Sequence, residues 1–535
     1  MHVLMVVPRY SSRWGEFYQF PLGLGYIASA MKKAGHTVSG LNLNHCVGDI
    51  EELVAAKVAE VDPDMCATGG LSPFLSIAQS IFNAARRTKP SILNLAGGGM
   101  VAGEPGVIMD VMDIDYGVVG EGEETIVELL DCIENNGVLL GVQGILFRDE
   151  AGVATQTLAR PQMSYLGDVA WPDYDLLDYG DNIENQRPLD SYFFHAEPNS
   201  RPRALDMITS RSCPFMCTFC FHPSGKTYRE RPLDDFFAEL DMLVERFDIN
   251  MIALIDELFS LKKRRLLEFC ERIKPYNLSW MVQLHVNSAS DETIAAMRDA
   301  GCVYISYGIE SMSQPVLESM QKKSKTERIE YALDLTYQSE IGIQGNLLFG
   351  DTAETLDTAN ESMHWWASNR HYQINLTPLI VFPGSPDYLE ALEDGMIDDR
   401  VAYVQNIPED FNISSMNNKN MEMVRFMVWV FSYSLLNMAP LHSFAESDEQ
   451  VSDRDTAYDI AWHCPRCDHD NTYKQVVLPQ HQSHSVRLSC RSCKSRWDLE
   501  NVTYVAPVNS IDDAACDRKL QEEQALFDAG KLGEC

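Results

Sequence analysis

The chain has 535 residues, of which 45% are hydrophobic and 23% charged, an ordinary globular composition with enough material for several domains. Its formal net charge of −35 argues against nonspecific binding to nucleic acid or to anionic membranes, because both require basic surfaces. The fourteen cysteines fall in two tight clusters and scattered singles. That pattern favours metal ligation in a reducing cytoplasm over disulfide bonds.

No segment of the sequence predicts membrane insertion. Residues 1–8 are a short apolar run that ends at a proline, which predicts a first strand rather than a signal peptide. The most apolar later stretch, 421–438, contains Glu422 and Arg425 and is too short to span a bilayer. We therefore expect a buried helix there, and a cytoplasmic protein that is not transmembrane.

Strands alternate with helices over residues 1–140, the first predicted domain. The predicted strands lie at residues 2–7, 38–43, 65–68, 92–95 and 116–119. This alternation predicts an α/β fold with a doubly wound, Rossmann-like parallel sheet of about five strands. Residues 141–200 follow as a predicted structured linker that joins this sheet to the next domain.

Glycines stand where three of these strands end. They are Gly69 and Gly70, followed by Ser72, then Gly97, Gly98 and Gly99, and finally Gly120 beside Glu121. Any one group is explained by a plain turn. Glycine also lets a flat or phosphate-bearing ligand approach the backbone closely, and three groups at one sheet edge favour a ligand site.

A short loop holds Cys213, Cys217 and Cys220 in the spacing C-x3-C-x2-C, directly after an apolar run at residues 204–208. Three thiolates this close can hold three corners of a cubane iron–sulfur cluster. One iron then stays open for a ligand that is not protein, whereas a pure electron carrier normally uses four cysteines. The alternatives are three ordinary buried cysteines or half of a zinc site.

Six strand–helix units follow one another over residues 201–395. Their predicted strands lie at residues 204–208, 251–255, 279–286, 302–309, 342–348 and 373–381. This order predicts a partial (β/α)6 barrel, with its active site at the C-terminal strand ends. Asp256, Gln283 and His285 occupy such ends and are candidates for substrate or cofactor contact. The alternative is that they are hydrogen-bonded polar residues of the core.

The C-terminal part is predicted to contain a helical extension at 396–455, a small module at 456–505 and an acidic tail at 506–535, which reads as helical or disordered. The module carries two C-x2-C pairs, Cys464 with Cys467 and Cys490 with Cys493, separated by 22 residues. Four thiolates at this spacing suit one tetrahedral ion. A structural zinc ribbon and a rubredoxin-like iron site both fit, and a second cubane cluster is a further alternative.

The context Ser-Arg-x-Cys-Pro-x-x-Cys-x-x-Cys at residues 210–220 resembles the radical S-adenosylmethionine (radical SAM) superfamily. The resemblance implies a [4Fe–4S] cluster on the three cysteines and SAM on its open iron. It implies that Phe219 lies near the adenine, and that Gly308, Glu310 and Ser311 hold the amino acid or ribose part of SAM. Gly345 and Gly350 resemble the ends of the segment that lines the adenine pocket.

The first domain resembles the cobalamin-binding domain found ahead of many radical SAM domains. This resemblance implies cobalamin, with contacts from Ser72, Gly97, Gly98, Gly99, Gly120 and Glu121. His45 matches half of the D-x-H-x-x-G motif that can supply an axial histidine, but Leu43 stands at the aspartate position. Axial ligation by His45 therefore stays open.

Together these resemblances imply a cobalamin-dependent radical SAM methyltransferase that acts on an unactivated carbon, or a phosphinate phosphorus, of a small biosynthetic intermediate. It would need an external electron donor such as flavodoxin or ferredoxin. The alternative enzyme is an oxidative cyclase or ring-rearranging enzyme resembling the anaerobic magnesium-protoporphyrin ester cyclases. A third hypothesis is a corrinoid or redox sensor without catalysis, against which the three cysteines and Glu310 argue.

Overall fold

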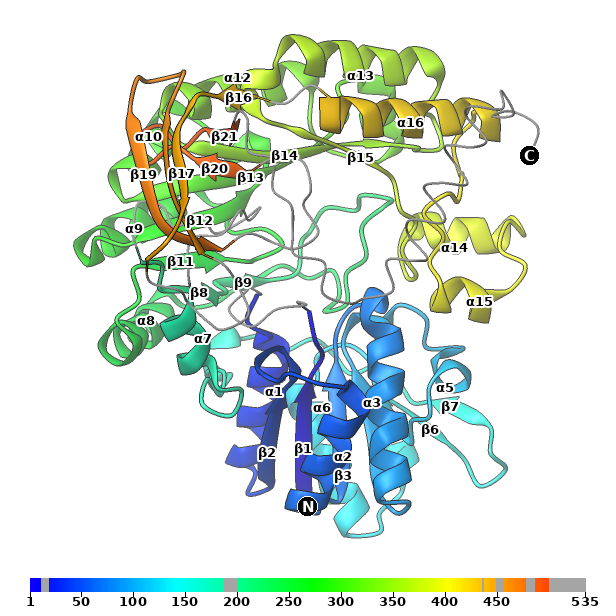
Figure 1. The fold of residues 1–535 in the computed structure, drawn as a ribbon. Helices are drawn as coiled ribbons and strands as arrows, with labels where there is room; N and C mark the ends of the chain where they lie inside the picture. Colours follow the sequence, from blue (N-terminus) through cyan, green and yellow to red (C-terminus); the bar gives the residue numbers. More distant parts are fainter. Residues whose placement is uncertain (11–18, 187–200, 435–436, 449–456, 478–485, 500–535) are drawn as a thin grey trace.

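The computed structural model describes residues 1–10, 19–186, 201–434, 437–448, 457–477 and 486–499. Figure 1 shows the N-terminal sheet domain at the bottom, a barrel-like domain above it, and the C-terminal strands beside the barrel at the upper left. Among the described residues, no helix combines the length and the apolar character needed to cross a membrane.

The N-terminal sheet has seven strands in the order β2-β1-β3-β4-β5-β6-β7. They are β1 (His2–Val7), β2 (Thr37–Asn42), β3 (Met65–Gly69), β4 (Leu93–Gly97), β5 (Tyr116–Val118), β6 (Ile145–Arg148) and β7 (Ala154–Gln156). The first five are parallel, in the 2-1-3-4-5 order of a doubly wound fold, which confirms the predicted sheet. Strands β6 and β7 extend it in antiparallel fashion, so residues from the predicted linker complete this sheet.

Helices cover both faces of this sheet. They are α1 (Leu22–Lys33), α2 (Ile50–Val61), α3 (Leu75–Thr88) and α6 (Glu123–Glu134). Helix α1 packs beside α6, and α2 packs beside α3. At the start of α2 the Asp49 carboxylate accepts hydrogen bonds from the amides of Glu51 and Glu52, an N-cap that satisfies two amides without helical partners.

The central domain is a single sheet of six parallel strands in the order β15-β14-β13-β12-β11-β8. They are β8 (Ala204–Met207), β11 (Met251–Leu254), β12 (Ser279–Leu284), β13 (Cys302–Glu310), β14 (Gly342–Phe349) and β15 (Asn375–Pro378). The covering helices are α8 (Leu233–Phe247), α9 (Lys263–Ile273), α10 (Asp291–Asp299), α12 (Thr326–Gln338) and α13 (Leu356–Ser368). The predicted partial barrel is confirmed.

One row of the barrel's inner wall is polar. The Tyr307 hydroxyl lies 2.9 Å from the Thr336 hydroxyl of α12, so Tyr307 points outward toward the helices. Side chains alternate along a strand, and its neighbour Ser306 therefore faces the interior. Ser306 pairs in register with Gln283 on one side and Gln344 on the other, which makes a row of polar side chains.

One hydrophobic core runs through both domains. At their junction the Phe20 ring stacks on Tyr174 with centroids 5.1 Å apart, and lies 4.3 Å from the ring of Tyr179. Tyr174 also packs edge-on against Phe247, at the end of the barrel helix α8. The two domains therefore share apolar packing and do not touch through polar loops alone.

The C-terminal part combines helices with two small sheets. Its elements are α15 (Arg400–Gln405), α16 (Asn418–Ser434), β16 (Met438–Ala439), β17 (Leu441–Glu446), β18 (Ala457–His463), β19 (Asp470–Val477), β20 (Arg487–Ser489) and β21 (Arg496–Leu499). Helix α16 buries Met421 and Val424 but exposes Phe426 and Trp429, so the helix predicted to be buried is buried on one face only. Strands β16 and β17 arise within the extension predicted as helical. The predicted tail at 506–535 lies outside the described residues.

The four-cysteine module docks at the N-terminal ends of the barrel strands. The Tyr304 hydroxyl, near the start of β13, donates a 3.0 Å hydrogen bond to the Lys494 carbonyl. The Arg496 amide donates to the Gln373 side chain at 2.7 Å, and the Arg466 guanidinium lies 3.6 Å from the centre of the Tyr337 ring. The module therefore covers the barrel end opposite to the C-terminal strand ends.

Asp206 of β8 is a buried carboxylate with few partners. The Phe20 amide donates to its Oδ2 at 2.6 Å, and its Oδ1 has no hydrogen-bond partner among the described residues. Burial raises the pKa of Asp206 to about 7. Because the unfolded chain ionises near pH 4, the contribution of this carboxyl to stability is fully present below that pH and is lost as the pH rises toward 7.

Asp206→Asn is therefore expected to raise the melting temperature of the apoprotein at pH 8, with little effect at pH 4. Ionisation of the buried Asp206 carboxyl at high pH destabilises the wild type by at most about 4 kcal/mol, the equivalent of three pKa units, and the substitution removes this destabilisation. Thermal unfolding followed at pH 4, 6 and 8 checks this, with exposed Asp299→Asn as the control. A difference between Asp206→Asn and wild type that does not grow with pH would contradict the assignment.

Candidate active site between the two domains

The three cysteines lie on one loop at the C-terminal end of β8. The loop leaves the barrel through β9 (Ser210–Arg211) and returns through β10 (Arg229–Glu230), which pairs with β9 in antiparallel fashion. The Thr218 amide donates to the Met320 carbonyl at 3.1 Å, and the Thr218 carbonyl accepts from the Asp387 amide at 3.0 Å. These bonds fix the middle of the loop to two other parts of the barrel domain.

The three thiols on this loop differ in pKa: that of Cys217 is lowered, whereas those of Cys213 and Cys220 are raised. A hydrogen bond from Cys220 lowers the pKa of Cys217 to about 7 against the effect of burial, and the Lys322 ammonium lowers it further. Burial raises the pKa of Cys213. Three cysteines beside a buried cation fit a [4Fe–4S] cluster, because the cation offsets the negative charge that thiolate ligands bring.

Glu310 and Lys322 form a buried ion pair near these cysteines. The Lys322 Nζ lies 2.8 Å from Glu310 Oε1, and each side chain is about nine-tenths buried. Burial lowers the pKa of Lys322, but Glu310 and the nearby thiols raise it above its ordinary value, so the amine stays protonated. A Cβ at Gly308 would lie 2.4 Å from the Lys322 Nζ, so glycine is required for this approach.

Lys322 was missed by the sequence reasoning, although Glu310 was named. Lys322 lies in the loop between α11 (Gln314–Ser319) and α12, where neighbouring lysines resemble an ordinary solvated run. Glu310 adopts a positive φ of 67°, a conformation rare for non-glycine residues and typical of strained functional sites. Glu310 and Lys322 together offer one negative and one positive group, which complement an amino acid zwitterion.

The other residues assigned to SAM lie after β13, on and after β14, and on the cysteine loop. The Ser311 hydroxyl lies 3.2 Å from the Ser362 hydroxyl and accepts from the Ser313 amide. A Cβ at Gly345 would lie 2.5 Å from Ile309, and Gly350 adopts a φ of 124°, so both positions require glycine. Phe219 lies on the cysteine loop and is partly buried.

The structure places Asp256 and His285 against the cysteine loop. Asp256 accepts hydrogen bonds from the Thr209 amide and the Ser210 hydroxyl, which anchors the start of the loop, and burial raises its pKa to about 6. The His285 ring stacks on Phe215 with centroids 4.5 Å apart, and burial lowers its pKa to about 4. Gln283 lies instead in the polar row of the inner wall.

His222, two residues after Cys220, is a further candidate that the sequence reasoning missed. Its Nδ1 lies 2.8 Å from the Glu257 carboxylate, and its side chain is about nine-tenths buried. Its Nε2 is buried with no hydrogen-bond partner among the described residues. A buried imidazole held by a carboxylate in this way resembles the orienting arrangement of catalytic histidines.

A cavity of about 430 Å³ lies between the domains and is lined by both of them. The sheet domain supplies the C-terminal ends of β3, β4 and β5, including Gly97, Gly98, Gly99, Gly120 and Glu121. The barrel domain supplies Ser210, Arg211 and Ser212, immediately before Cys213, and also Asp256 and Glu257. The cavity therefore adjoins the cysteine loop.

The wall of this cavity fits a large ring system. It is mostly apolar, with side chains such as Met5, Leu95 and Val118. A Cβ at Gly98 would lie 2.9 Å from the Gly70 carbonyl, so the turn after β4 has no room for a side chain. Ser72 and His45 are not among the lining residues. Burial lowers the pKa of His45 to about 4, which keeps its imidazole neutral.

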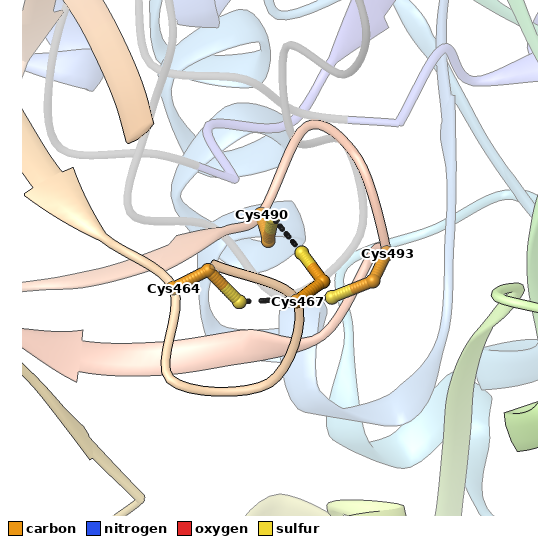
Figure 2. A group of neighbouring side chains, drawn as sticks. All are labelled: Cys464, Cys467, Cys490 and Cys493. Atoms are coloured by element: carbon orange, nitrogen blue, oxygen red, sulfur yellow. Dashed lines mark hydrogen bonds between the residues drawn. The ribbon is translucent and has the colours of Figure 1, made fainter. Parts of the chain in front are cut away.

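The four cysteines of the C-terminal module converge on one point (Figure 2). The sulfurs of Cys464 and Cys493 are 3.7 Å apart, and those of Cys467 and Cys490 are 3.6 Å apart. Sulfur atoms bound tetrahedrally at about 2.3 Å from one zinc ion lie about 3.8 Å apart. The geometry of the four sulfurs fits a single ion. The module contacts Tyr304, which lies about 20 Å along β13 from Glu310.

We expect Cys490→Ser to remove one metal ion per chain and to lower the melting temperature, because binding of structural zinc contributes on the order of 10 kcal/mol to folding of such modules. Elemental analysis and thermal unfolding check this, with Cys132→Ser as the control. SAM cleavage is expected to persist if the ion is structural. A loss of cleavage with a physiological electron donor would favour the rubredoxin-like alternative.

Sequence comparisons agree with the two halves of the site. A model described as the radical SAM superfamily matches residues 207–363, and a model described as the B12 binding domain matches residues 16–130. The chain is therefore a radical SAM enzyme. More specifically, it belongs to the radical SAM enzymes that carry an N-terminal cobalamin-binding domain.

The relatives include two kinds of enzyme. The chain is 28% identical over 344 residues to an uncharacterized methyltransferase of Pyrococcus horikoshii, covering 63% of this chain and 70% of that protein. It is 25% identical over 383 residues to the anaerobic magnesium-protoporphyrin IX monomethyl ester cyclase of Rubrivivax gelatinosus, covering 68% of this chain and 66% of the relative.

A similar solved structure is that of the radical SAM methyltransferase TsrM from Kitasatospora setae, with cobalamin and a [4Fe–4S] cluster bound. The TM-score is 0.59 at 20% identity, over 74% of this chain and 75% of that one. This likeness supports the arrangement of the fold.

Proposed function

We propose that this cobalamin-dependent radical SAM enzyme is a methyltransferase that acts on an unactivated carbon, or a phosphinate phosphorus, of a small biosynthetic intermediate. The observation that carries the proposal is the cavity between the domains, because its wall continues from the glycine-rich sheet edge to the residue before Cys213. A corrin in that cavity would lie beside the cysteine loop. A relative named as a methyltransferase supports this choice.

When bound, the cluster supplies the electron that splits SAM into methionine and a 5′-deoxyadenosyl radical, and cobalamin supplies a transferable methyl group. Cys213, Cys217 and Cys220 would hold three irons of the cluster. The Glu310 carboxylate would accept hydrogen bonds from the N–H groups of the SAM amine, and the Lys322 ammonium would pair with the SAM carboxylate. Both interactions orient SAM before the reaction and reduce its freedom at the cluster.

The chain would position a polar substrate along the barrel's inner wall. Gln283, Ser306 and Gln344 offer amide and hydroxyl groups in one row. His222, held by Glu257, is suited to accept or donate a proton beside the loop.

Deuterium labelling tests the methyl transfer. Reduced holoprotein is incubated anaerobically with SAM that carries a CD₃ group, and free cobalamin without protein is the control. We expect S-adenosylhomocysteine to form together with CD₃ label in the corrinoid fraction. With candidate substrates, CD₃-labelled product and 5′-deoxyadenosine are expected together.

Formation of 5′-deoxyadenosine without S-adenosylhomocysteine would contradict methyl transfer. That result would favour the cyclase alternative, which the magnesium-protoporphyrin ester cyclase relative supports. Failure of the reconstituted, reduced protein to cleave SAM at all would favour a corrinoid or redox sensor. The electron donor, flavodoxin or ferredoxin, is part of the same proposal and can be replaced by a chemical reductant in this test.

A further inference from the structure

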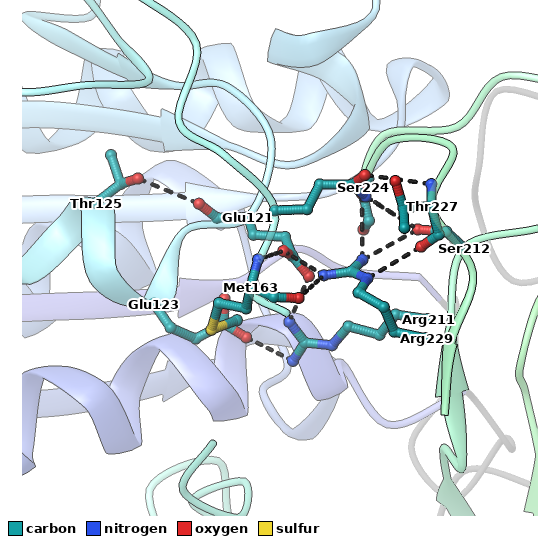
Figure 3. A network of polar contacts seen from close by, with 10 residues as sticks. Glu121, Glu123, Thr125, Met163, Arg211, Ser212, Ser224, Thr227 and Arg229 are labelled. Carbon is teal, nitrogen blue, oxygen red and sulfur yellow. Dashed lines mark hydrogen bonds and ion pairs between the residues drawn. The ribbon is translucent and has the colours of Figure 1, made fainter. Parts of the chain in front are cut away.

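A buried network of ion pairs joins the sheet domain to the cysteine loop (Figure 3). The Glu121 carboxylate, which follows β5, forms ion pairs with two guanidinium groups, one on each oxygen. Arg211 of β9 lies 3.1 Å from one oxygen, and Arg229 of β10 lies 2.7 Å from the other. Glu123 pairs with the same Arg211 at 2.6 Å. All four side chains are about nine-tenths buried. The network therefore lies in the interior of the interface and differs from exposed surface ion pairs, which contribute little to stability.

On the barrel side, the network continues to the residue beside the first cluster cysteine. Arg229 donates a 3.2 Å hydrogen bond to the Ser212 hydroxyl, and that hydroxyl donates to the Ser224 carbonyl. Ser212 is almost fully buried and has a φ of 66°, which is unfavourable for a residue with a side chain. The bonds to Ser212 therefore hold a strained turn between Arg211 and Cys213.

On the sheet side, the network is part of the cavity wall. Glu121, Glu123, Arg211 and Ser212 all line the cavity. A Cβ at Gly122 would lie 2.7 Å from Ile27, so the turn that presents Glu121 is tightly packed. The Met163 amide donates to Glu121 at 3.0 Å, and Arg229 donates to the Met163 carbonyl at 2.9 Å.

The charges of this network depend on one another. Burial acts to raise the pKa of Glu121, but Arg229 and Arg211 lower it below its ordinary value, so the carboxylate stays charged. Its oxygens accept from two guanidinium groups and one amide, which leaves little capacity to bind a ligand directly. Removing the negative charge would leave two buried cations with less compensation, a costly change.

We propose that Glu121, Arg211 and Arg229 are positioning residues that fix the corrinoid domain relative to the cysteine loop, and thereby set the separation of the two cofactors. Corrinoid binding and the conformation of the loop are then coupled through the same side chains. This inference requires both cofactors to bind, and it does not depend on whether the reaction is methyl transfer or cyclisation. It gives Glu121 a role distinct from the direct corrinoid contact expected from the sequence.

The separation can be measured directly by dipolar electron paramagnetic resonance (EPR) spectroscopy. In reduced holoprotein, cob(II)alamin and the reduced [4Fe–4S] cluster each carry an unpaired electron spin, and their coupling reports the distance between them. We expect one narrow distance in the wild type and a broadened or shifted distribution in Glu121→Gln. Corrinoid affinity of Glu121→Gln is expected to fall about tenfold, the equivalent of about 1.4 kcal/mol.

Glu124→Gln is the matched control, because Glu124 stands three residues after Glu121, in the first turn of α6, but is 61% exposed and lies 3.7 Å from its partner Arg160. It should leave both the distance and the affinity unchanged. Arg211→Lys keeps the positive charge but cannot bind Glu121 and Glu123 at once with two guanidinium nitrogens. If Glu121→Gln does not fold, the same distance and affinity are measured in Arg211→Lys. The double variant should be no worse than the more affected single variant, since both changes break one network.

An unchanged distance distribution in Glu121→Gln and in Arg211→Lys would overturn the inference, even if both variants were less stable. Strictly additive losses of corrinoid affinity in the double variant would also overturn the coupling. A wild-type protein without a cob(II)alamin signal would contradict the two-cofactor proposal itself. A wild-type signal with unchanged variants would overturn only the positioning role.

Discussion

Cys217→Ala is expected to abolish reductive cleavage of SAM, to less than about a thousandth of the wild-type rate, which corresponds to at least about 4 kcal/mol in the barrier. Cys217 lies in the centre of the loop, and the Cys220 hydrogen bond and the Lys322 charge favour its thiolate. With two cysteines left, the loop cannot hold three irons of a cubane cluster. The measurement is 5′-deoxyadenosine formation by anaerobically reconstituted protein with reductant.

The matched control for this change is Cys132→Ala, because Cys132 is a partly buried cysteine of α6 that belongs to neither cysteine cluster. It should retain the iron content and the EPR signal of the reduced cluster. Full SAM cleavage by Cys217→Ala, with four irons still bound, would show that the cluster lies elsewhere and would contradict the site.

Lys322→Met is expected to weaken SAM binding about 100-fold, which corresponds to about 3 kcal/mol. This change removes the positive half of the ion pair and leaves the buried Glu310 carboxylate without it, and breaking such a pair typically costs about 3–5 kcal/mol. Equilibrium binding of SAM to the reconstituted, oxidised protein measures the effect without turnover. Lys322→Arg should restore part of the affinity, since it keeps the charge.

Lys323→Met provides the comparison, because Lys323 is adjacent in sequence but exposed. It should bind SAM as the wild type does. If Lys322→Met and Lys323→Met bound SAM equally well, the pair of Glu310 and Lys322 would be part of the fold alone, and the proposed orientation of SAM would be wrong.

The regular parts of the fold could be predicted from the sequence because their patterns are local. The six barrel strands are apolar runs separated by helices with clear periodicity, and each is found within a few residues of its expected place. Strands β6 and β7 were less evident. They are short, antiparallel and partly exposed, and their pairing depends on the sheet edge at β5, which is a tertiary contact.

The site could be predicted only in part, for a related reason. The cysteines of each cluster are close in sequence, so spacing identified them. Lys322 meets Glu310 across 12 residues and a helix, and Arg229 meets Glu121 across 108 residues. No sequence pattern signals such pairs. Asp256 was found by its position at a strand end, but its anchoring of the cysteine loop needed coordinates.

The four-cysteine module lies at the opposite end of the barrel from the cysteine loop. Tyr304 and Gln373 hold it at the N-terminal end of the barrel, whereas the cysteine loop lies at the C-terminal end. In barrel enzymes the former end contributes stability and the latter carries the chemistry. This position is compatible with a structural ion in the module.

Cofactor analysis of anaerobically purified protein tests the central claim most directly, namely that a corrinoid and a cluster share this interface. We predict about one corrinoid per chain, about four irons on the loop and one further ion on the C-terminal cysteines. Replacing Cys213, Cys217 and Cys220 together by alanine should remove the four irons and leave the corrinoid and the further ion. Protein that holds its cluster but never binds a corrinoid would contradict the account.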